Sequence, residues 1–206
     1  FEKSDKKTIV FFSAYQPEAV TYIWANHFNY QEIALKILSQ SIPPDWKILY
    51  KEYPQKILHS SSKFFLLRTK NYYTRLSKMK ILYFVDDRIS NKELINGCFA
   101  TSSINGSMSW ESLFLKKPTI IFGNIWYQNF PYVYKVSDNK DCVKILNKIK
   151  KIKNFELKKI YKSLEILYSN TNDLIYNKFS NKILNKKELD FIAKAFYDYY
   201  KEETKN

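Results

Sequence analysis

Residues 98–115 read CFATSSINGSMSWESLFL. The first part, residues 98–103, predicts a buried strand. Gly106, one of only 3 glycines in 206 residues, follows in a short turn. The last part is amphipathic and predicts a helix that runs to about residue 115. A strand that turns directly into a helix is the repeating unit of an α/β sheet, so this stretch indicates the fold class.

The alternation of strand and helix continues on both sides of this stretch. Further apolar runs predict strands at residues 8–15, 47–53, 81–85, 118–123 and 132–136. Helical spacing of apolar residues predicts helices at residues 28–41, 71–79, 91–98, 141–151, 154–169 and 187–203. From Gln16 onward a polar loop that opens at Pro17 leads to the first helix, and residues 55–70 read as a loop with some helix.

Strands that alternate with helices imply a parallel sheet with helices on both faces. Right-handed crossovers then give a Rossmann-like three-layer α/β domain with a mostly parallel sheet of roughly five or six strands. The length fits one domain, residues 1–206, in which residues 151–206 form C-terminal helices. The chain does not begin with Met and its start, FEKSDKKTIV, lacks the form of a signal peptide, so we expect a piece of a longer protein.

The composition excludes some classes of protein and leaves others open. Hydrophobic residues make up 45% and aromatic residues 17%, which predicts a sizeable core and excludes global disorder. No apolar run reaches the roughly 18 residues of a membrane span. The net charge of +14 favours an acidic partner such as nucleic acid, an anionic lipid surface or a phosphorylated substrate. The charge is equally explained by a Lys-rich composition whose lysines only solvate helix faces.

The residues that usually bind metals or attack substrates are sparse. Cys98 and Cys142 form no CxxC pair and are interpreted as small core residues in a reducing compartment. His27 and His59 are isolated, and no Ser-His-Asp or Cys-His set is readable. We therefore expect no metal site and no resident cofactor, and no catalytic residue is assigned.

Ligands of open α/β sheets bind at the carboxyl ends of the strands, so the polar residues that follow strands are candidates. They are Gln16, Pro17 and Glu18 after the first strand, Lys51, Glu52 and Tyr53 at the end of the second, and Asp86 and Asp87 after the third. The alternative for each group is structural: a turn with a helix start, a surface ion pair, and a polar loop or helix cap.

The fourth strand is followed by the strongest of these motifs. We expect Gly106 to adopt a positive φ and Ser107 to cap the helix, whose free N–H groups and dipole favour a phosphate. Ser103 and Asn105 add donors, and Glu111, one turn beyond Ser107, can accept hydrogen bonds from ribose hydroxyls. The alternative is a plain helix N-cap. The motif is neither GxGxxG nor a P-loop, which excludes those nucleotide sites.

Three ordered stretches carry a resemblance to a known family. FFSAYQPEAV at 11–20, PPDWKILYKEYPQ at 43–55 and SINGSMSWESLFLKKPTIIFGNIWYQNFPYVYKV at 103–136 resemble capsular polysaccharide biosynthesis proteins. Those are glycosyltransferases of the GT-B type, related to the bacterial Kdo transferases of capsule assembly. The resemblance covers about residues 8–150 and implies the C-terminal, donor-binding half of a GT-B enzyme. The N-terminal acceptor domain would then lie upstream of Phe1.

The family motifs can be placed on this chain residue by residue. The positions that match are Gln16, Pro17, Glu18, Lys51, Glu52, Pro54, Gly106, Ser107, Trp110, Glu111, Lys117, Pro118, Phe122, Gly123, Trp126 and Tyr127. Asn105 and Ser109 replace a Thr and a second Gly of the family pattern. Tyr53 replaces the His that the family associates with the donor phosphate, and a tyrosine carries no positive charge near neutral pH.

The resemblance implies a function and its partners. The chain would bind a nucleotide-sugar, with a CMP-activated acidic sugar favoured over a UDP-sugar, for metal-independent transfer to a glycan or glycolipid acceptor. It would act in the cytoplasm, with peripheral association at the inner membrane and no specific nucleic acid. A non-catalytic polysaccharide assembly or export protein with the same fold is the alternative that Tyr53 suggests. A basic nucleic-acid-binding domain is a third reading, favoured only by the charge.

Overall fold

The computed structural model describes residues 7–16, 19–53 and 68–171, and the predictions at Pro17, Glu18, Pro54, His59 and residues 187–203 lie outside these ranges. The chain forms two compact units, Phe1–Phe155 and Glu156–Asn206, each of which is described by itself. The second unit contributes α9 (Leu157–Thr171) to the described part.

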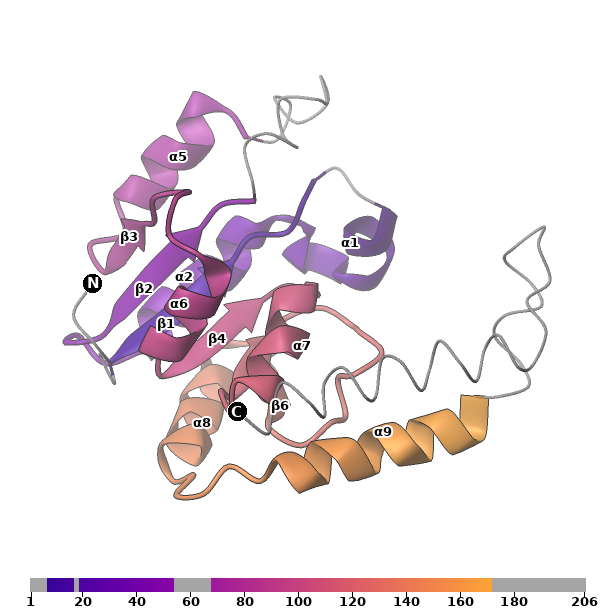
Figure 1. Cartoon of the computed structure of the whole chain (residues 1–206). Coiled ribbons are helices and arrows are strands. Elements are labelled where there is room, and N and C mark those ends of the chain that lie inside the picture. Colours follow the sequence, from indigo (N-terminus) through magenta and orange to yellow (C-terminus); the bar gives the residue numbers. More distant parts are fainter. Residues whose placement is uncertain (1–6, 17–18, 54–67, 172–206) are drawn as a thin grey trace. The chain divides into compact units, whose positions relative to one another are not determined.

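The first unit contains a six-stranded, all-parallel sheet (Figure 1). The order across the sheet is β3-β2-β1-β4-β5-β6. Its strands are β1 (Thr8–Phe12), β2 (Lys47–Lys51), β3 (Leu82–Phe84), β4 (Ala100–Ser103), β5 (Thr119–Ile121) and β6 (Val133–Lys135). This confirms the predicted Rossmann-like α/β fold.

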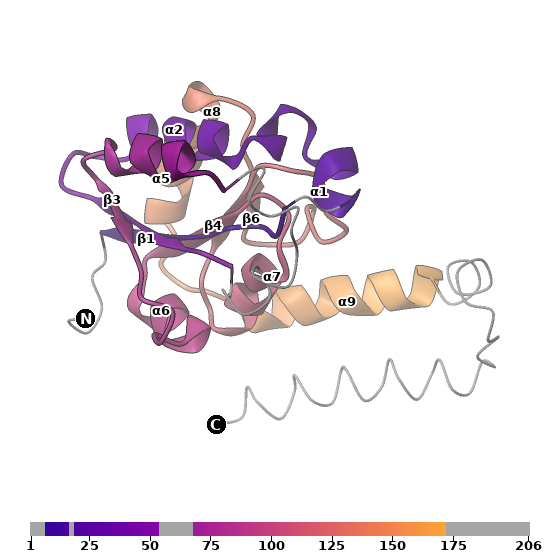
Figure 2. The ribbon, with the colours of Figure 1, turned by 90° about the horizontal axis from the view of Figure 1, so that it is seen from above.

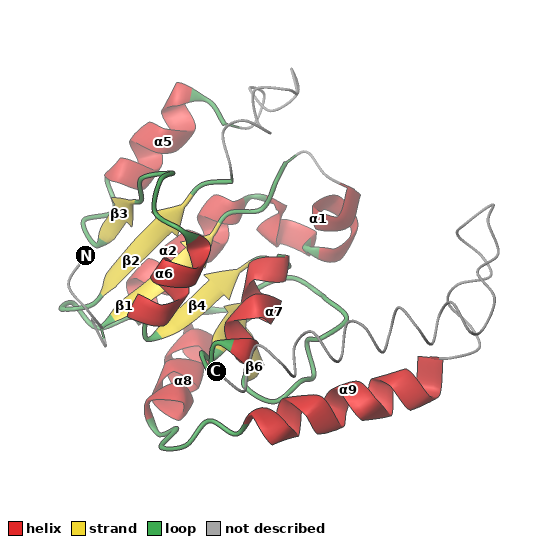
Figure 3. Cartoon of the chain, in the orientation of Figure 1, coloured by secondary structure: helices red, strands yellow, loops and turns green. Residues whose placement is uncertain are grey.

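Helices connect the first five strands in turn and α8 follows β6, and most helices lie where the sequence predicts them (Figure 3). They are α1 (Ala19–Trp24), the 3-10 helix η1 (Asn26–Asn29), α2 (Gln31–Ser41), α5 (Lys70–Ser77), α6 (Asn91–Gly97), α7 (Ser107–Phe114) and α8 (Asn139–Lys150). Thr69, Ser90 and Asp138 each accept a backbone N–H at the start of a helix, which fixes where α5, α6 and α8 begin.

The prediction of a polar loop between the first strand and the first helix is wrong. The segment forms α1 and η1 instead, because tertiary contacts hold it. The backbone N–H of Asn124 donates to the carbonyl of Trp24 at 2.8 Å, and Thr21 and Ala25 are buried. Three side chains of α1 stay on the surface: Tyr22, Ile23 and Trp24 are each more than half exposed. A helix that buries so few apolar residues shows little of the 3.6-residue periodicity of apolar positions by which helices are recognised in a sequence.

Alternate residues of β1 pack on opposite faces of the sheet. Ile9 and Phe11 join the larger core cluster with α2, α5 and α8, while Val10 and Phe12 face the smaller cluster that includes α6. Figure 2 shows α2, α5 and α8 on one side of the sheet and α6 and α7 on the other. Because both faces are covered, β1 is buried along its whole length, as its continuous apolar run predicts.

Gly123 lies where two backbone segments approach each other. It follows β5, and its N–H donates to the carbonyl of Ile104 at 2.7 Å. A Cβ placed on Gly123 would lie 3.2 Å from the Ile104 carbonyl oxygen and 3.3 Å from Cα of Ala25. Both neighbours are main-chain atoms, so they cannot move aside as a side chain would. A glycine is therefore required for close packing at this position.

We expect Gly123→Ala to lower the free energy of unfolding by about 1–3 kcal/mol, because the added methyl group overpacks two backbone segments. Gly106→Ala is the matched control, since a Cβ there meets only the side chain of Ser103, at 3.7 Å. It should change stability by about 1 kcal/mol or less. Urea unfolding of both variants measures the difference, and equal stabilities would contradict the packing role of Gly123.

Candidate functional site

The strand order changes direction between β1 and β4. The chain places β2 and β3 on one side of β1 and then returns to add β4 and the later strands on the other side. β1 and β4 pair in parallel, so Phe12 lies beside Ser103 at their carboxyl ends. At such a switch point the following loops diverge and leave a crevice in which α/β proteins bind ligands. The predicted motif at Gly106 begins three residues beyond Ser103.

The start of α7 differs from the sequence prediction in two respects. Gly106 has φ −87° and ψ 157°, an extended conformation rather than a positive φ. Gly106 is itself the N-cap, whereas Ser107 is the first helical residue and is exposed. Gly106 has no side chain with which to cap the helix, and no side-chain cap is found among the described residues. The chain enters α7 from an extended conformation, so a residue in the left-handed region is not needed. The first backbone N–H groups of α7 can therefore donate to another acceptor.

Hydrogen bonds from inside the protein hold this turn in place. The Gly106 N–H donates to the Ser103 Oγ at 3.2 Å, and the Ser103 and Ser109 hydroxyls lie 2.7 Å apart. The Tyr127 hydroxyl donates to the Gly106 carbonyl at 2.5 Å. Ser103 and Ser109 are buried, and Asn105 is 7% exposed, so these predicted donors belong mainly to the support of the turn.

Glu111 lies one helical turn beyond Ser107. Residues four apart share a face of a helix, so the Glu111 carboxylate lies below the exposed Ser107. Burial raises the pKa of Glu111 above its ordinary value of 4.5. Within the described ranges no hydrogen bond or ion pair of this carboxylate is found, so its acceptor oxygens are available to a ligand.

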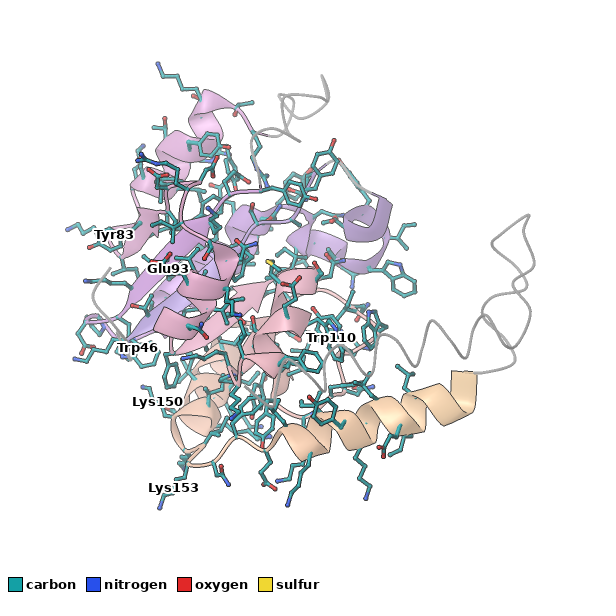
Figure 4. The ribbon with its side chains drawn as sticks, viewed as in Figure 1. Trp46, Tyr83, Glu93, Trp110, Lys150 and Lys153 are labelled. Carbon is teal, nitrogen blue, oxygen red and sulfur yellow. The ribbon has the colours of Figure 1, made fainter. Side chains whose placement is uncertain are left out.

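Trp110 packs behind the turn. Its ring contacts Phe114, Trp126, Tyr127 and Phe130, with ring centroids 4.7–5.5 Å apart. Trp110 is buried, whereas Trp126 is 54% exposed. In Figure 4 Trp110 lies on α7, away from the end of the sheet where β1 and β2 begin. The cluster supports the turn from the inside and presents the open face of Trp126 to solvent.

Glu52 lies at the centre of a second network, formed by the ends of β1 and β2 together with α5. Its Oε1 accepts hydrogen bonds from the Ser13 hydroxyl at 2.6 Å and from the Tyr53 N–H at 2.9 Å. Its Oε2 accepts from the hydroxyls of Tyr50 and Tyr73, at 2.8 and 2.9 Å. The four bonds use the four acceptor positions of a carboxylate. A contact with a sugar hydroxyl would require Glu52 to exchange one of these partners.

Arg68 supplies the opposite charge to this carboxylate. The Arg68 Nε lies 3.3 Å from the Glu52 Oε2, and the two side chains are only 2% and 12% exposed. Its Nη1 and Nη2 donate to the Gln16 Oε1 at 3.1 Å and to the Ala14 carbonyl at 3.0 Å. The guanidinium also lies 4.8 Å from the ring centre of Tyr72. Arg68 therefore ties the loop after β1 to the end of β2.

Tyrosine hydroxyls complete the network. Burial raises the pKa of Tyr50 and of Tyr72, so both hydroxyls stay protonated and can donate. The two hydroxyl oxygens are 3.1 Å apart. Because Tyr50 donates to Glu52, Tyr72 is left to donate to Tyr50. The Tyr53 ring packs against Tyr15 with centroids 5.4 Å apart, so the residue in place of the family His lies beside the loop after β1.

Two other predicted residues also make internal contacts. Gln16 is 3% exposed; it accepts from Gln31 Nε2 at 2.7 Å and donates to the Asn29 carbonyl, which joins the loop after β1 to α2. Lys51 is 7% exposed and donates to the carbonyls of Asp86 and Ile89, at 2.9 and 3.1 Å. Lys51 thus holds the loop that follows β3.

The structure brings those predicted residues that it describes to one edge of the sheet and separates them into two groups. Gly106, Ser107 and Glu111 face outward at α7, while Gln16, Lys51 and Glu52 hold the neighbouring loops. Sequence reasoning missed Ser13, Gln31, Arg68 and Tyr73. Of these four, only Ser13 could have been found from the sequence, because it is a polar residue that directly follows β1. In the described ranges no group of three His, Cys, Asp or Glu residues is arranged to hold a metal ion.

No protein-family model and no curated protein matches this sequence. Solved structures are similar in fold. UDP-GlcNAc 2-epimerase from Methanocaldococcus jannaschii has a TM-score of 0.51 at 16% identity, over 80% of this chain and 46% of that chain. KpsC, a beta Kdo 2,4 transferase from Thermosulfurimonas dismutans, has a TM-score of 0.49 at 15% identity, over 68% of this chain and 41% of that chain. The wall teichoic acid polymerase TagF has a TM-score of 0.43 at 15% identity, over 98% of this chain and 45% of that chain.

At these identities the similarity concerns the fold. The match to the epimerase agrees with the six-stranded parallel sheet and shows that the chain has a Rossmann-like α/β fold. The chain spans less than half of the length of each of these three proteins. The activity of a whole protein of this kind is therefore a proposal for this chain.

The buried network predicts that Glu52→Gln is strongly destabilising. The substitution replaces the carboxylate that lies 3.3 Å from the buried Arg68 guanidinium by a neutral amide and should cost about 3–5 kcal/mol of unfolding free energy. Glu32→Gln is the matched control, because Glu32 pairs with Arg75 at the surface, where the loss of an ion pair has little effect. Thermal unfolding of both variants tests the difference. A Glu52→Gln protein as stable as its control would contradict the structural role of Glu52.

Proposed function

We propose that this chain is the donor-binding half of a GT-B glycosyltransferase that acts in the synthesis of a capsular or other surface polysaccharide. The observation that carries the proposal is the start of α7, which lies at the switch point between β1 and β4 and, in the described part of the chain, has no side-chain cap. Uncapped N–H groups at a helix start favour a phosphate, and a nucleotide-sugar carries its phosphates between nucleoside and sugar. The choice of this family of enzymes rests on the three ordered sequence motifs.

In this proposal the outward-facing residues meet the donor. The N–H groups of Ser107 and the next residues of α7 bind the phosphate, and the absent side chain of Gly106 gives it room. Glu111 accepts a hydrogen bond from a ribose or sugar hydroxyl. A CMP-activated acidic sugar is the favoured donor and a UDP-sugar the alternative; both are taken from the sequence resemblance. Gln16, Lys51 and Glu52 act on the donor mainly by holding the loops in position.

The acceptor and the catalytic base are not assigned to this chain. We propose that a second domain supplies them, together with a glycan or glycolipid acceptor, at the cytoplasmic face of the inner membrane. No helix in the described ranges is long and apolar enough to cross a membrane. The exposed side chains of Tyr22, Trp24 and Trp126 near the carboxyl edge offer apolar surface to such a domain or to the acceptor.

A second candidate function is favoured by Tyr53. A protein that keeps the fold but has lost transfer would serve in polysaccharide assembly or export, and the loss of a histidine at the donor phosphate is consistent with that role. Sugar transfer by the full-length protein distinguishes the two candidates, because both allow a nucleotide to bind. A nucleic-acid-binding function has only the net charge in its favour.

Calorimetric titration of the chain with CMP and UDP tests the proposed site. We expect the parent to bind, with CMP favoured, and Gly106→Ala to weaken binding about tenfold or more, because the methyl group occupies the space of the phosphate and costs a charge-assisted hydrogen bond. The near-unchanged stability expected for this variant separates a lost site from a lost fold. If the variant binds as the parent does, or the parent binds neither nucleotide, the helix start is not a phosphate site.

The role of Glu111 predicts a pH dependence. Because burial raises its pKa above 4.5, Glu111 is protonated at a higher pH than an ordinary glutamate. We expect the affinity for CMP to fall as the pH is lowered through this raised pKa, since the neutral acid accepts hydrogen bonds less strongly.

Glu111→Gln should bind more weakly at neutral pH and lack this acidic step. Its melting temperature at neutral pH should not fall, because the amide removes a half-buried charge. The measurement is the same titration repeated between neutral and mildly acidic pH. A parent and variant with identical pH profiles would show that Glu111 does not meet the ligand.

A further inference from the structure

The lysines of the first unit are distributed unevenly along the strands. In a parallel sheet all strands begin at one edge, here called the amino edge. We define it by the strand starts, the helix ends that lead to them, and the end of α8 with the loop after it: residues 7, 42–47, 77–82, 96–100, 115–119 and 148–155. These segments hold ten lysines: Lys7, Lys47, Lys78, Lys80, Lys116, Lys117, Lys148, Lys150, Lys151 and Lys153. The acidic residue among them is Asp45, which pairs with Lys7.

The opposite edge, at the carboxyl ends of the strands, has no such excess. Its described segments are residues 13–16, 51–53, 85–91, 103–107, 122–127 and 136–141. They carry three cations, Lys51, Arg88 and Lys140, and five carboxylates, Glu52, Asp86, Asp87, Asp138 and Asp141. Arg68 and Lys70 at the start of α5 and Lys135 at the end of β6 also lie at this edge, so its described residues hold six cations and five carboxylates. A general bias of the composition toward lysine would place similar numbers of lysines at both edges. The positive charge of the described part of this unit is therefore concentrated at the edge away from the candidate donor site.

Direct contacts join the segments of the amino edge into one surface. The Lys47 N–H donates to the Lys7 carbonyl at 2.9 Å, and the Ile48 N–H to the Ile81 carbonyl at 2.8 Å. The Lys150 Nζ lies 5.1 Å from the ring centre of Trp46. In Figure 4 Trp46, Lys150 and Lys153 lie together at the end of the sheet where the strands begin, with Tyr83 on the same side.

Helix dipoles explain only part of this arrangement. A lysine in the last turn of a helix stabilises the free carbonyls there, which accounts for Lys148 and Lys150 in α8 and for Lys78 after α5. It does not account for Lys7 and Lys47 at strand starts, nor for the lysines that lie in loops beyond the helix ends. All ten except Lys117 are exposed, so most of these charges reach solvent.

From this distribution we propose that the amino edge of the sheet is a docking surface for an anionic lipid bilayer, which orients the donor edge away from the membrane. Each lysine close to an anionic leaflet adds about 1 kcal/mol of attraction, so several lysines on one surface suffice for reversible binding. The cations come from five of the six segments, which are spread along a sheet edge, and this suits contact with an extended charged surface. The inference rests on the charge distribution and is independent of the sugar-transfer proposal.

The side chains favour lipid headgroups over nucleic acid. Every cation of the amino edge is a lysine, whereas arginine is the residue that binds phosphates and bases in bidentate fashion. Single-stranded nucleic acid also needs open aromatic rings for stacking. Trp46 is only 7% exposed and is covered by Lys150 and Phe99, so its ring is closed to a base. Lys150 above the covered ring of Trp46 therefore provides charge without a surface on which a base could stack.

Cosedimentation with vesicles tests this docking surface in the whole chain. The probes are vesicles of phosphatidylcholine alone and vesicles of equal parts phosphatidylcholine and phosphatidylglycerol. The edge variant carries Lys80→Glu, Lys151→Glu and Lys153→Glu. The control variant carries Lys36→Glu, Lys92→Glu and Lys140→Glu, which are exposed lysines outside the amino edge with the same change in net charge.

We expect the parent to bind the anionic vesicles, to release them as salt is raised, and to ignore phosphatidylcholine. The edge variant should lose more than about tenfold in apparent affinity, and the control much less. Thermal unfolding monitors the fold of both variants. If the edge variant melts early, the corresponding Lys→Gln variant replaces it and should lose part of the affinity.

Three results would overturn the proposal. One is a parent that does not sediment with anionic vesicles at low salt. Another is an equal loss in the edge and control variants, which would mean that net charge rather than a surface drives binding. The third is a parent that, at the same salt, binds a single-stranded oligonucleotide more tightly than the vesicles and loses this binding in the edge variant, since the partner would then be nucleic acid.

Discussion

The parallel pairing of β1 with β4 is the constraint on which the rest of the structure depends. The chain builds β2 and β3 outward from β1 and then has to return across the sheet to add β4 on the other side. This return brings Phe12 beside Ser103 and places two diverging connections next to each other. A crevice is expected at such a point from the topology, because the connections that follow the two strands diverge there. The start of α7 lies at this point.

Polar residues near this crevice have two different tasks. Glu52, Arg68 and Gln16 form a buried network that uses nearly all of its own hydrogen-bonding capacity. Such a network fixes the loops after β1 and β2, since an unpaired buried charge would cost several kcal/mol. Gly106, Ser107 and Glu111 leave donors and acceptors toward solvent. The loops can therefore be rigid while the outward-facing groups stay ready for a ligand.

The two edges of the sheet differ in charge in a way that is compatible with two separate roles. The carboxyl edge balances its few charges, whereas the amino edge gathers lysines with a single described carboxylate. A parallel sheet makes this separation possible, because every strand start lies at one edge and every strand end at the other. Lysines placed at strand starts and at helix ends in the sequence therefore add up on one surface.

The sequence by itself determined the fold class and the edge on which the candidate residues lie. Strand runs such as residues 8–12 are apolar throughout because both faces of a parallel sheet are covered, so their signal is strong. Sequence reasoning misplaced the cap of α7 and the conformation of Gly106, because an extended strand end can enter a helix without a positive φ. Only the tertiary structure decided which candidates face inward: Arg68 and Glu52 are 16 residues apart in the sequence, and their pairing leaves no local pattern.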